Sequence, residues 1–176
     1  MHKALISILL PAAAIIASGP LNAASGLRCE AKLSGAQETA NVQTDASGNL
    51  VVKFDAAFTK VDVRLRVRGG LDANRAHFHC ARPGANGPIA LGLFDPGPLI
   101  FDGRVARGTL LNEDFSVADC VPTAERPVNN IAALAFAMRD GLVYINVHTP
   151  ANPGGEIRGQ MLCNAKHDDG HDSDSD

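Results

Sequence analysis

The stretch on which the fold depends is residues 142–162, LVYINVHTPANPGGEIRGQML. Its first part alternates like a strand, with Val143, Ile145 and Val147 on one face and Tyr144, Asn146 and His148 on the other. The prolines and glycines of residues 150–155 cannot continue a strand, and a second strand follows over residues 156–161. The sequence therefore predicts a β-hairpin closed by a stiff loop. His148, Glu156 and Arg158 flank this loop, which is more polar functionality than a connecting loop needs.

Other stretches have the alternation or apolar content of strands, namely residues 27–34, 49–55, 60–68, 73–80, 89–94 and 103–111. Residues 60–68 are the clearest, because their apolar side chains fall on one face and their charged side chains on the other. Arg64, Arg66 and Arg68 share the charged face. They could attract an anion, although a solvated strand face is the commoner use of such a pattern.

One segment has helical period, since Ile131, Leu134 and Met138 would lie on one side of a helix. Asn129 or Asn130 can cap its start, and Gly141 can stop it. Many short strands, regular turn signals and this one helix predict an all-β protein. We expect an antiparallel, Greek-key-like β-sandwich or barrel with one short helix at about residues 130–139.

The two ends of the chain differ in composition from the domain between them. Residues 1–24 have a basic start, an apolar stretch and small residues at Ala23 and Ala24, as a cleaved signal peptide does. An uncleaved N-terminal anchor is the alternative. Residues 166–176 are rich in Asp and His and predict a disordered tail. The domain between them, residues 25–165, is expected in the periplasm or outside the cell, with no transmembrane segment.

The four cysteines of the chain are widely spaced and include no Cys-x-x-Cys pair. In an exported protein this predicts two disulfides rather than a thiolate metal site. Four cysteines allow three pairings, and the sequence alone does not choose among them. We favour Cys29–Cys163, because Cys29 opens the first predicted strand and Cys163 closes the last; Cys80 would then pair with Cys120.

The composition argues against some classes of partner. The net charge is −3, and no basic stripe indicates nucleic-acid binding. Tryptophan is absent and there is one tyrosine, so stacking platforms for sugars or bases are not expected. No serine lies in a Gly-x-Ser-x-Gly context, and we predict no catalytic residues. Glu38 and Glu156 are isolated carboxylates, for which a surface salt bridge between Glu156 and Arg158 or another arginine is the expected use.

The predicted metal ligands are His77, His79 and His148. Residues i and i+2 of a strand share a face about 6.6–6.8 Å apart, so the first two imidazoles could converge on one ion. If their strands are neighbours, His148 supplies a third nitrogen beside the loop at one end of the sandwich. Three imidazoles suit copper or zinc, with Cu²⁺ preferred over Zn²⁺. The alternative is that these histidines hydrogen-bond loop backbone, or that one of them faces solvent.

Four segments together resemble the CHRD (chordin) domain family. Residues 75–89 are similar to its alanine-histidine-x-histidine-glycine-proline-alanine segment, and residues 144–160 to its closing signature. Residues 33–39 resemble its opening signature, and residues 108–111 its middle. The resemblance covers the domain from about residue 28 to residue 163. Cys80, where the family usually has glycine, and Cys120, in a longer region, depart from the pattern in a way that fits an added disulfide.

The resemblance implies an extracytoplasmic β domain and no reaction. Chordin, which names the family, is an extracellular protein that binds growth factors, and bacterial members are mostly exported single domains without an assigned activity. We therefore predict a non-catalytic binding module with an unidentified protein or small-molecule ligand. The alternative is a histidine-ligated copper protein, with superoxide dismutase-like redox activity as an analogy at the level of the fold. A third reading gives the domain a structural or adhesion role, with the acidic tail binding Ca²⁺; a solubilising tail fits its composition better.

Overall fold

The computed structural model describes residues 26–40, 42–115, 120–121 and 126–164. The predicted signal peptide and the predicted tail lie outside these residues. Within them, the domain is built of antiparallel strands with one α-helix, as the sequence predicts. No helix in the described ranges is long and apolar enough to cross a membrane.

Eight of the ten strands follow the predicted ranges closely. The ten are β1 (Arg28–Ser34), β2 (Ser47–Phe54), β3 (Lys60–Arg68), β4 (Arg75–Cys80), β5 (Ile89–Phe94), β6 (Ile100–Phe101), β7 (Val105–Leu111), β8 (Val143–His148), β9 (Ile157–Gln160) and β10 (Leu162–Cys163). The sequence did not predict the two-residue strands β6 and β10, which are too short to show a period. Two short 3₁₀ turns, η1 (Gly35–Gln37) and η2 (Asn112–Asp114), complete the set with the helix α1 (Ile131–Arg139).

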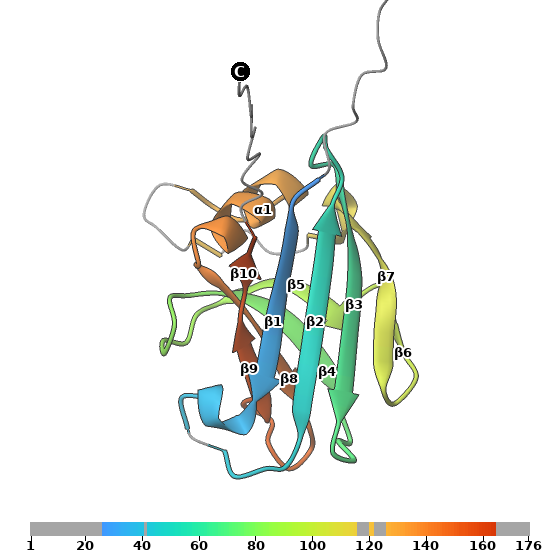
Figure 1. The fold of residues 1–176 in the computed structure, drawn as a ribbon, viewed down its shortest axis with the longest axis vertical. Helices are drawn as coiled ribbons and strands as arrows, with labels where there is room; N and C mark the ends of the chain where they lie inside the picture. The colour runs from blue at the N-terminus through green and yellow to red at the C-terminus, as the bar shows by residue number, and fades with distance from the viewer. Residues whose placement is uncertain (1–25, 41, 116–119, 122–125, 165–176) are drawn as a thin grey trace, which may run out of the picture.

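One antiparallel sheet, rather than two separate ones, wraps around the core. Its strands run in the order β5-β4-β8-β9-β1-β2-β3-β7-β6, and β10 pairs with β1 beyond this path. The chain turns directly from β5 to β6, and Leu99 N donates to Leu93 O across that turn at 2.9 Å. The sheet therefore curls into a nearly closed barrel, with β1, β2 and β3 on one side and β4, β5 and β8 on the other (Figure 1).

Alternation decides which side chains fill the barrel. In β3 every apolar residue is buried and every charged residue is exposed, as its pattern predicts. Leu50 and Leu65 face each other in register and are completely buried. Phe78 of β4 and Ile145 of β8 do the same from the other side of the barrel. The apolar residues of all the long strands thus form one continuous core.

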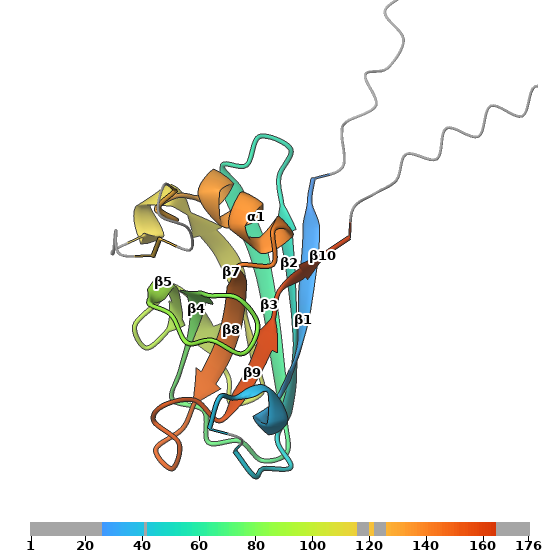
Figure 2. The same cartoon turned by 90° about the vertical axis from the view of Figure 1, so that its left-hand side faces the viewer.

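The helix α1 lies across the end of the barrel where β8 begins (Figure 2). Asn130 caps it, because its side-chain oxygen accepts a hydrogen bond from Ala133 N at 2.8 Å. Ile131, Leu134 and Met138 are buried on one side of the helix, which confirms the predicted stripe. Gly141 follows the helix at a φ of 69°, a conformation that glycine adopts without strain.

The favoured disulfide pairing is confirmed. Cys29 is bonded to Cys163 where β1 pairs with β10, which ties the first strand to the last. Cys80 at the end of β4 is bonded to Cys120. No cysteine of the described chain is free. Two disulfides are consistent with an extracellular location, because such bonds persist in oxidising compartments.

Candidate metal centre

The strands β4 and β8 are buried on both faces, unlike β3. Every residue of β8 is buried, including the polar residues that point out of the barrel. We call the outward side chains of β4, β8 and β9 the covered face; they are His77, His79, Tyr144, Asn146, His148 and Arg158. Two loops shield them from solvent, residues 81–88 after β4 and residues 149–156 after β8. Hydrogen bonds from the covered face to loop backbone hold both loops in place.

Strand register brings the three predicted histidines together. His77 lies opposite Asn146, and His79 lies opposite Tyr144, in the antiparallel pair of β4 and β8. His148 is opposite Arg75, so it is the diagonal neighbour of His77 on the same face of the sheet. Long side chains in such diagonal positions are close enough to touch. The Nδ1 atom of His77 lies 3.1 Å from the Nε2 atom of His148. One nitrogen of each of the three imidazoles lies within 4.8 Å of the others.

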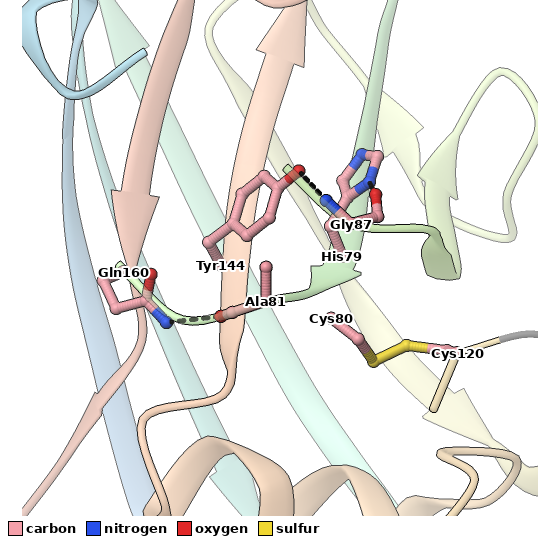
Figure 3. The surroundings of a disulfide bond; sticks show 7 residues. All are labelled: His79, Cys80, Ala81, Gly87, Cys120, Tyr144 and Gln160. Carbon is pink, nitrogen blue, oxygen red and sulfur yellow. Dashed lines mark hydrogen bonds between the residues drawn. A yellow bond between two sulfur atoms is a disulfide. The ribbon is translucent and has the colours of Figure 1, made fainter. Parts of the chain in front are cut away.

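The cluster lies between two loops. The sequence predicted it at one end of the sandwich, beside residues 150–155, and His148 makes a hydrogen bond to that loop. Its Nδ1 atom lies 3.0 Å from the carbonyl oxygen of Pro153. His79 sits further along the strands and contacts the other loop, with Nδ1 at 2.9 Å from Gly87 O (Figure 3). The cluster therefore runs along the outer side of the sheet, because β4 and β8 pair over their whole length.

The loop contacts assign the protons on two of the rings. A carbonyl oxygen only accepts hydrogen bonds, so the Nδ1 atoms of His79 and His148 carry hydrogen and donate. In the neutral rings, both Nε2 atoms then keep a lone pair. His148 Nε2 accepts from Nδ1 of His77. His79 Nε2 is buried and has no hydrogen-bond partner among the described residues.

Burial keeps all three imidazoles neutral. The loss of hydration lowers the pKa of His77 to about 4, and the positive charges of neighbouring histidines and Arg75 act in the same direction. The pKa values of His79 and His148 are also lowered, chiefly by burial, although each donates to a carbonyl that raises it. Neutral imidazole is the form that binds a metal ion.

An aromatic stack fixes the position of His79. Its ring lies parallel to that of Tyr144, with centroids 4.9 Å apart. The guanidinium carbon of Arg158 lies 3.4 Å from the centre of the Tyr144 ring. Because β8 lies between β4 and β9, the tyrosine separates the arginine from the histidine. The Tyr144 hydroxyl also accepts from Gly87 N at 3.3 Å, so this loop is held from two sides (Figure 3).

A buried carboxyl group, that of Glu38, lies next to Gly155 and the Asn146 side chain, and sequence reasoning did not connect it with the covered face. A Cβ atom on Gly155 would lie 2.5 Å from Glu38 Oε1 and 2.6 Å from Asn146 Nδ2, so both groups press on that glycine. Glu38 Oε1 and Asn146 Oδ1 have no partner among the described residues. Burial raises the pKa of Glu38 to about 7, against the opposing effect of Arg158. The β1–β2 connection carries Glu38 here, and no periodic pattern encodes that path.

The prediction of a salt bridge between Glu156 and an arginine is wrong. Its carboxylate accepts hydrogen bonds from three neutral side chains, those of Thr44, Thr149 and Asn152. Arg158 turns away from it and donates to Asn86 Oδ1 at 3.0 Å and to Ala85 O. Glu156 lies just before β9, which begins at Ile157, so strand alternation does not place its side chain on the same face as that of Arg158. The ion pairs of the described residues are Arg28–Glu30 and Arg139–Asp140.

The geometry fits a small metal ion after a modest shift. Nitrogen ligands lie about 2.0–2.1 Å from zinc, and copper is of similar size, so two nitrogens on one ion are at most about 4.2 Å apart. The 3.1 Å separation of His77 Nδ1 and His148 Nε2 suits two such ligands once the proton on His77 Nδ1 moves to Nε2 of the same ring, which frees the Nδ1 lone pair. A movement of His79 by about 1 Å would complete a three-nitrogen site. The backbone carbonyls of Gly87 and Pro153 hold the rings of His79 and His148 and would orient them toward an ion, as outer partners do in metal proteins.

The comparisons with known proteins identify a family and no individual relative. The family model described as CHRD domain matches residues 29–161. No curated protein matches the chain. No solved structure matches it either.

Proposed function

Because the chain belongs to the CHRD domain family, we propose that it is an exported, non-catalytic binding domain that holds a copper ion at His77, His79 and His148. The family supports a binding role. The two disulfides support a location outside the cytoplasm. The histidine cluster supplies the chemistry, since three imidazole nitrogens are a donor set that suits copper.

The single observation that carries this proposal is the Nε2 atom of His79. It is buried, it holds a lone pair, and it has no partner among the described residues. An unpaired buried polar atom costs about 1–3 kcal/mol. The other expected role of these histidines, hydrogen bonding to loops, accounts for Nδ1 of His79 and His148 but provides no partner for this atom, although the Asn146 side chain lies near the ring and raises the pKa of His79. A metal ion shared with His148 would supply the missing partner.

Copper is preferred to zinc on chemical grounds. Nitrogen sites bind first-row divalent ions with an affinity that peaks at copper. A structural zinc site normally has four protein ligands. The cluster supplies three, and no Asp, Glu or Cys joins it among the described residues.

The test is a copper titration of the protein recovered after export, with His167→Ala and His171→Ala in place. These two changes remove the histidines of the acidic tail, which would otherwise bind copper weakly. We expect one equivalent of tightly bound copper. His79→Phe keeps an aromatic ring against Tyr144 and removes both nitrogens, so it should abolish tight binding while the β circular-dichroism signal persists.

The matched control is Thr149→Val. It removes the 2.6 Å hydrogen bond to Glu156 in the loop that covers His148, but no nitrogen ligand. Copper affinity should therefore remain within a few-fold of the parent protein. Unchanged affinity in His79→Phe would refute the site, and so would the absence of a tight equivalent in the parent protein. In that case a plain binding module with another ligand remains.

Superoxide dismutase-like activity is a narrower prediction that the same sample tests. It requires bound copper to alternate between two oxidation states with superoxide as the partner. The expected result for a pure binding domain is that copper-loaded protein removes superoxide no faster than His79→Phe does.

A further inference from the structure

We infer that the centre formed by His77, His79 and His148 holds copper as Cu⁺ in preference to Cu²⁺. This inference rests on the proposed function and specifies its ligand. It follows from the burial and the charge of the surroundings, because both make the binding of a divalent ion less favourable than that of a monovalent ion.

The first argument is the loss of hydration. The three histidine side chains expose 9% or less of their surface. An ion that enters such a place loses its water shell, and that cost grows with the square of its charge. The cost for Cu²⁺ is therefore about four times that for Cu⁺. A site that favours the divalent ion must recover the difference with negative ligands.

The second argument is that the ligand set carries no negative charge. The cluster has three imidazoles and no Asp, Glu or Cys among the described residues. Each imidazole is neutral when it binds the ion. The bound complex would thus keep the whole charge of the metal, one unit for Cu⁺ and two for Cu²⁺.

The third argument is the sign of the nearest charged side chains. Arg75 lies two residues before His77 on the same face of β4 and directly opposite His148 on β8. It makes no ion pair within the described residues, and its Nε atom is buried without a partner. Arg158 lies behind Tyr144 on the side of His79. Both guanidinium groups repel a dication twice as strongly as a monocation.

The negative charge of the Glu38 carboxyl group does not cancel the positive charge of both arginines. It packs beside Gly155 and Asn146, and the charge that acts on it most is that of Arg158. When ionised, it offsets that one arginine and leaves Arg75 uncompensated. Glu156, the other acid near the loops, is turned toward Thr44, Thr149 and Asn152. No further acidic side chain belongs to the centre in the part of the chain that the structure describes.

Coordination number agrees with the charge argument. Cu²⁺ favours tetragonal sites, which need four or more ligands in a near-planar arrangement. Cu⁺ has a filled d shell and accepts three nitrogens without a geometric demand. Additional water ligands for Cu²⁺ would need room on a face that two loops already cover.

The experiment compares the two affinities in the full exported chain with His167→Ala and His171→Ala. Cu⁺ is titrated without oxygen against the chelator bicinchoninate, and Cu²⁺ in air against nitrilotriacetate. We expect the dissociation constant for Cu⁺ to be at least tenfold lower than that for Cu²⁺. A tenfold ratio raises the reduction potential of the bound ion by about 59 mV above that of aqueous copper.

Arg75→Gln tests the cause. Removal of this charge should strengthen Cu²⁺ binding more than Cu⁺ binding, and so lower the affinity ratio several-fold. Arg64→Gln, on an exposed and distant part of β3, should leave the ratio unchanged. Equal or tighter binding of Cu²⁺ by the parent protein would overturn the inference while the copper site stands. Failure to bind either ion tightly would instead remove the proposed function.

Discussion

Two outer surfaces of the same barrel have the same sequence pattern and opposite environments. On β3, outward residues such as Arg64 and Arg66 are exposed to solvent. On β4 and β8, outward residues such as His77 and Asn146 are buried. The alternation of apolar and polar residues therefore predicts which side chains point out of the barrel. It does not predict whether those side chains are exposed to solvent or covered by protein.

The difference comes from the connections. The strands β2 and β3 are joined by a tight turn over residues 55–59, in which Asp55 accepts from the backbone of Thr59 and Lys60. A turn of this kind is too short to cover the outer face of the sheet. The loops after β4 and β8 are longer, and both fold back over the strands that they leave. The histidine cluster forms on the second surface, where side chains are both polar and shielded from water.

Replacement of one arginine on each surface should give the largest contrast. Arg158→Ala removes a buried side chain that donates to Asn86 and Ala85 and that offsets Glu38. We expect a loss of about 3–5 kcal/mol in the free energy of unfolding. Arg64→Ala on the exposed surface should change it by less than about 0.5 kcal/mol. Urea denaturation measures both, and losses of similar size would contradict the contrast.

Acid should weaken the covered face next most strongly. An unfolded histidine titrates near pH 6.5, whereas the pKa of His77 in the folded protein is about 4. The folded state thus binds fewer protons between these values. The stabilisation is complete above about pH 6.5 and is lost as the pH falls toward 4. For His77 it is on the order of 2–3 kcal/mol, measured by urea denaturation across this range with EDTA present.

Glu38 acts in the opposite direction and provides the control. Its pKa is raised from 4.5 to about 7, so its stabilisation is present below about pH 4.5 and is lost as the pH rises through 7. In Glu38→Gln only the histidine effect remains, and stability should fall more steeply with acid than in the parent protein. A parent protein whose stability is independent of pH, in which Glu38→Gln changes nothing, would show that these groups are not buried in solution.

Two adjacent glycines sharpen the comparison within one loop. Gly155→Ala places a Cβ atom 2.5 Å from Glu38 Oε1 at a φ of 127°, and we expect it to cost about 1–3 kcal/mol. Gly154→Ala meets nothing within 4 Å and should be nearly neutral. Thermal unfolding of the two variants measures this difference in stability. Equal melting temperatures would mean that the loop does not press on the covered face.

The smallest effect is expected on the exposed surface. Arg64 lies directly opposite Arg107 on β7, and like charges in that position repel. Arg64→Thr should therefore stabilise the protein by a few tenths of a kcal/mol, and the gain should shrink at high salt. Arg66→Thr is the control, because Arg66 faces Val105 and Asn49. A gain that does not depend on salt would point to strand propensity instead of charge.

The long strands and the helix were predictable because each carries its own period. The range of β3 was predicted to the residue, and α1 differs from its prediction by one position. The histidine cluster was predictable in part, since His77 and His79 share a face by spacing alone. Its link to His148 required β4 and β8 to be neighbours, which the sequence suggested and did not require. Glu38 could not be placed, because its position depends on how an irregular connection folds.

The sequence by itself determined the antiparallel all-β class, the export-compatible cysteines and the placement of His77 and His79 on one face of a strand. These features are local, since they follow from side-chain alternation and residue type along a single segment. Only the tertiary structure decided that loops cover β4 and β8, that Glu38 and Arg158 lie beneath them, and that His79 keeps an unpaired nitrogen. Burial arises from contacts between segments far apart in the chain, and it is burial that keeps the three imidazoles neutral.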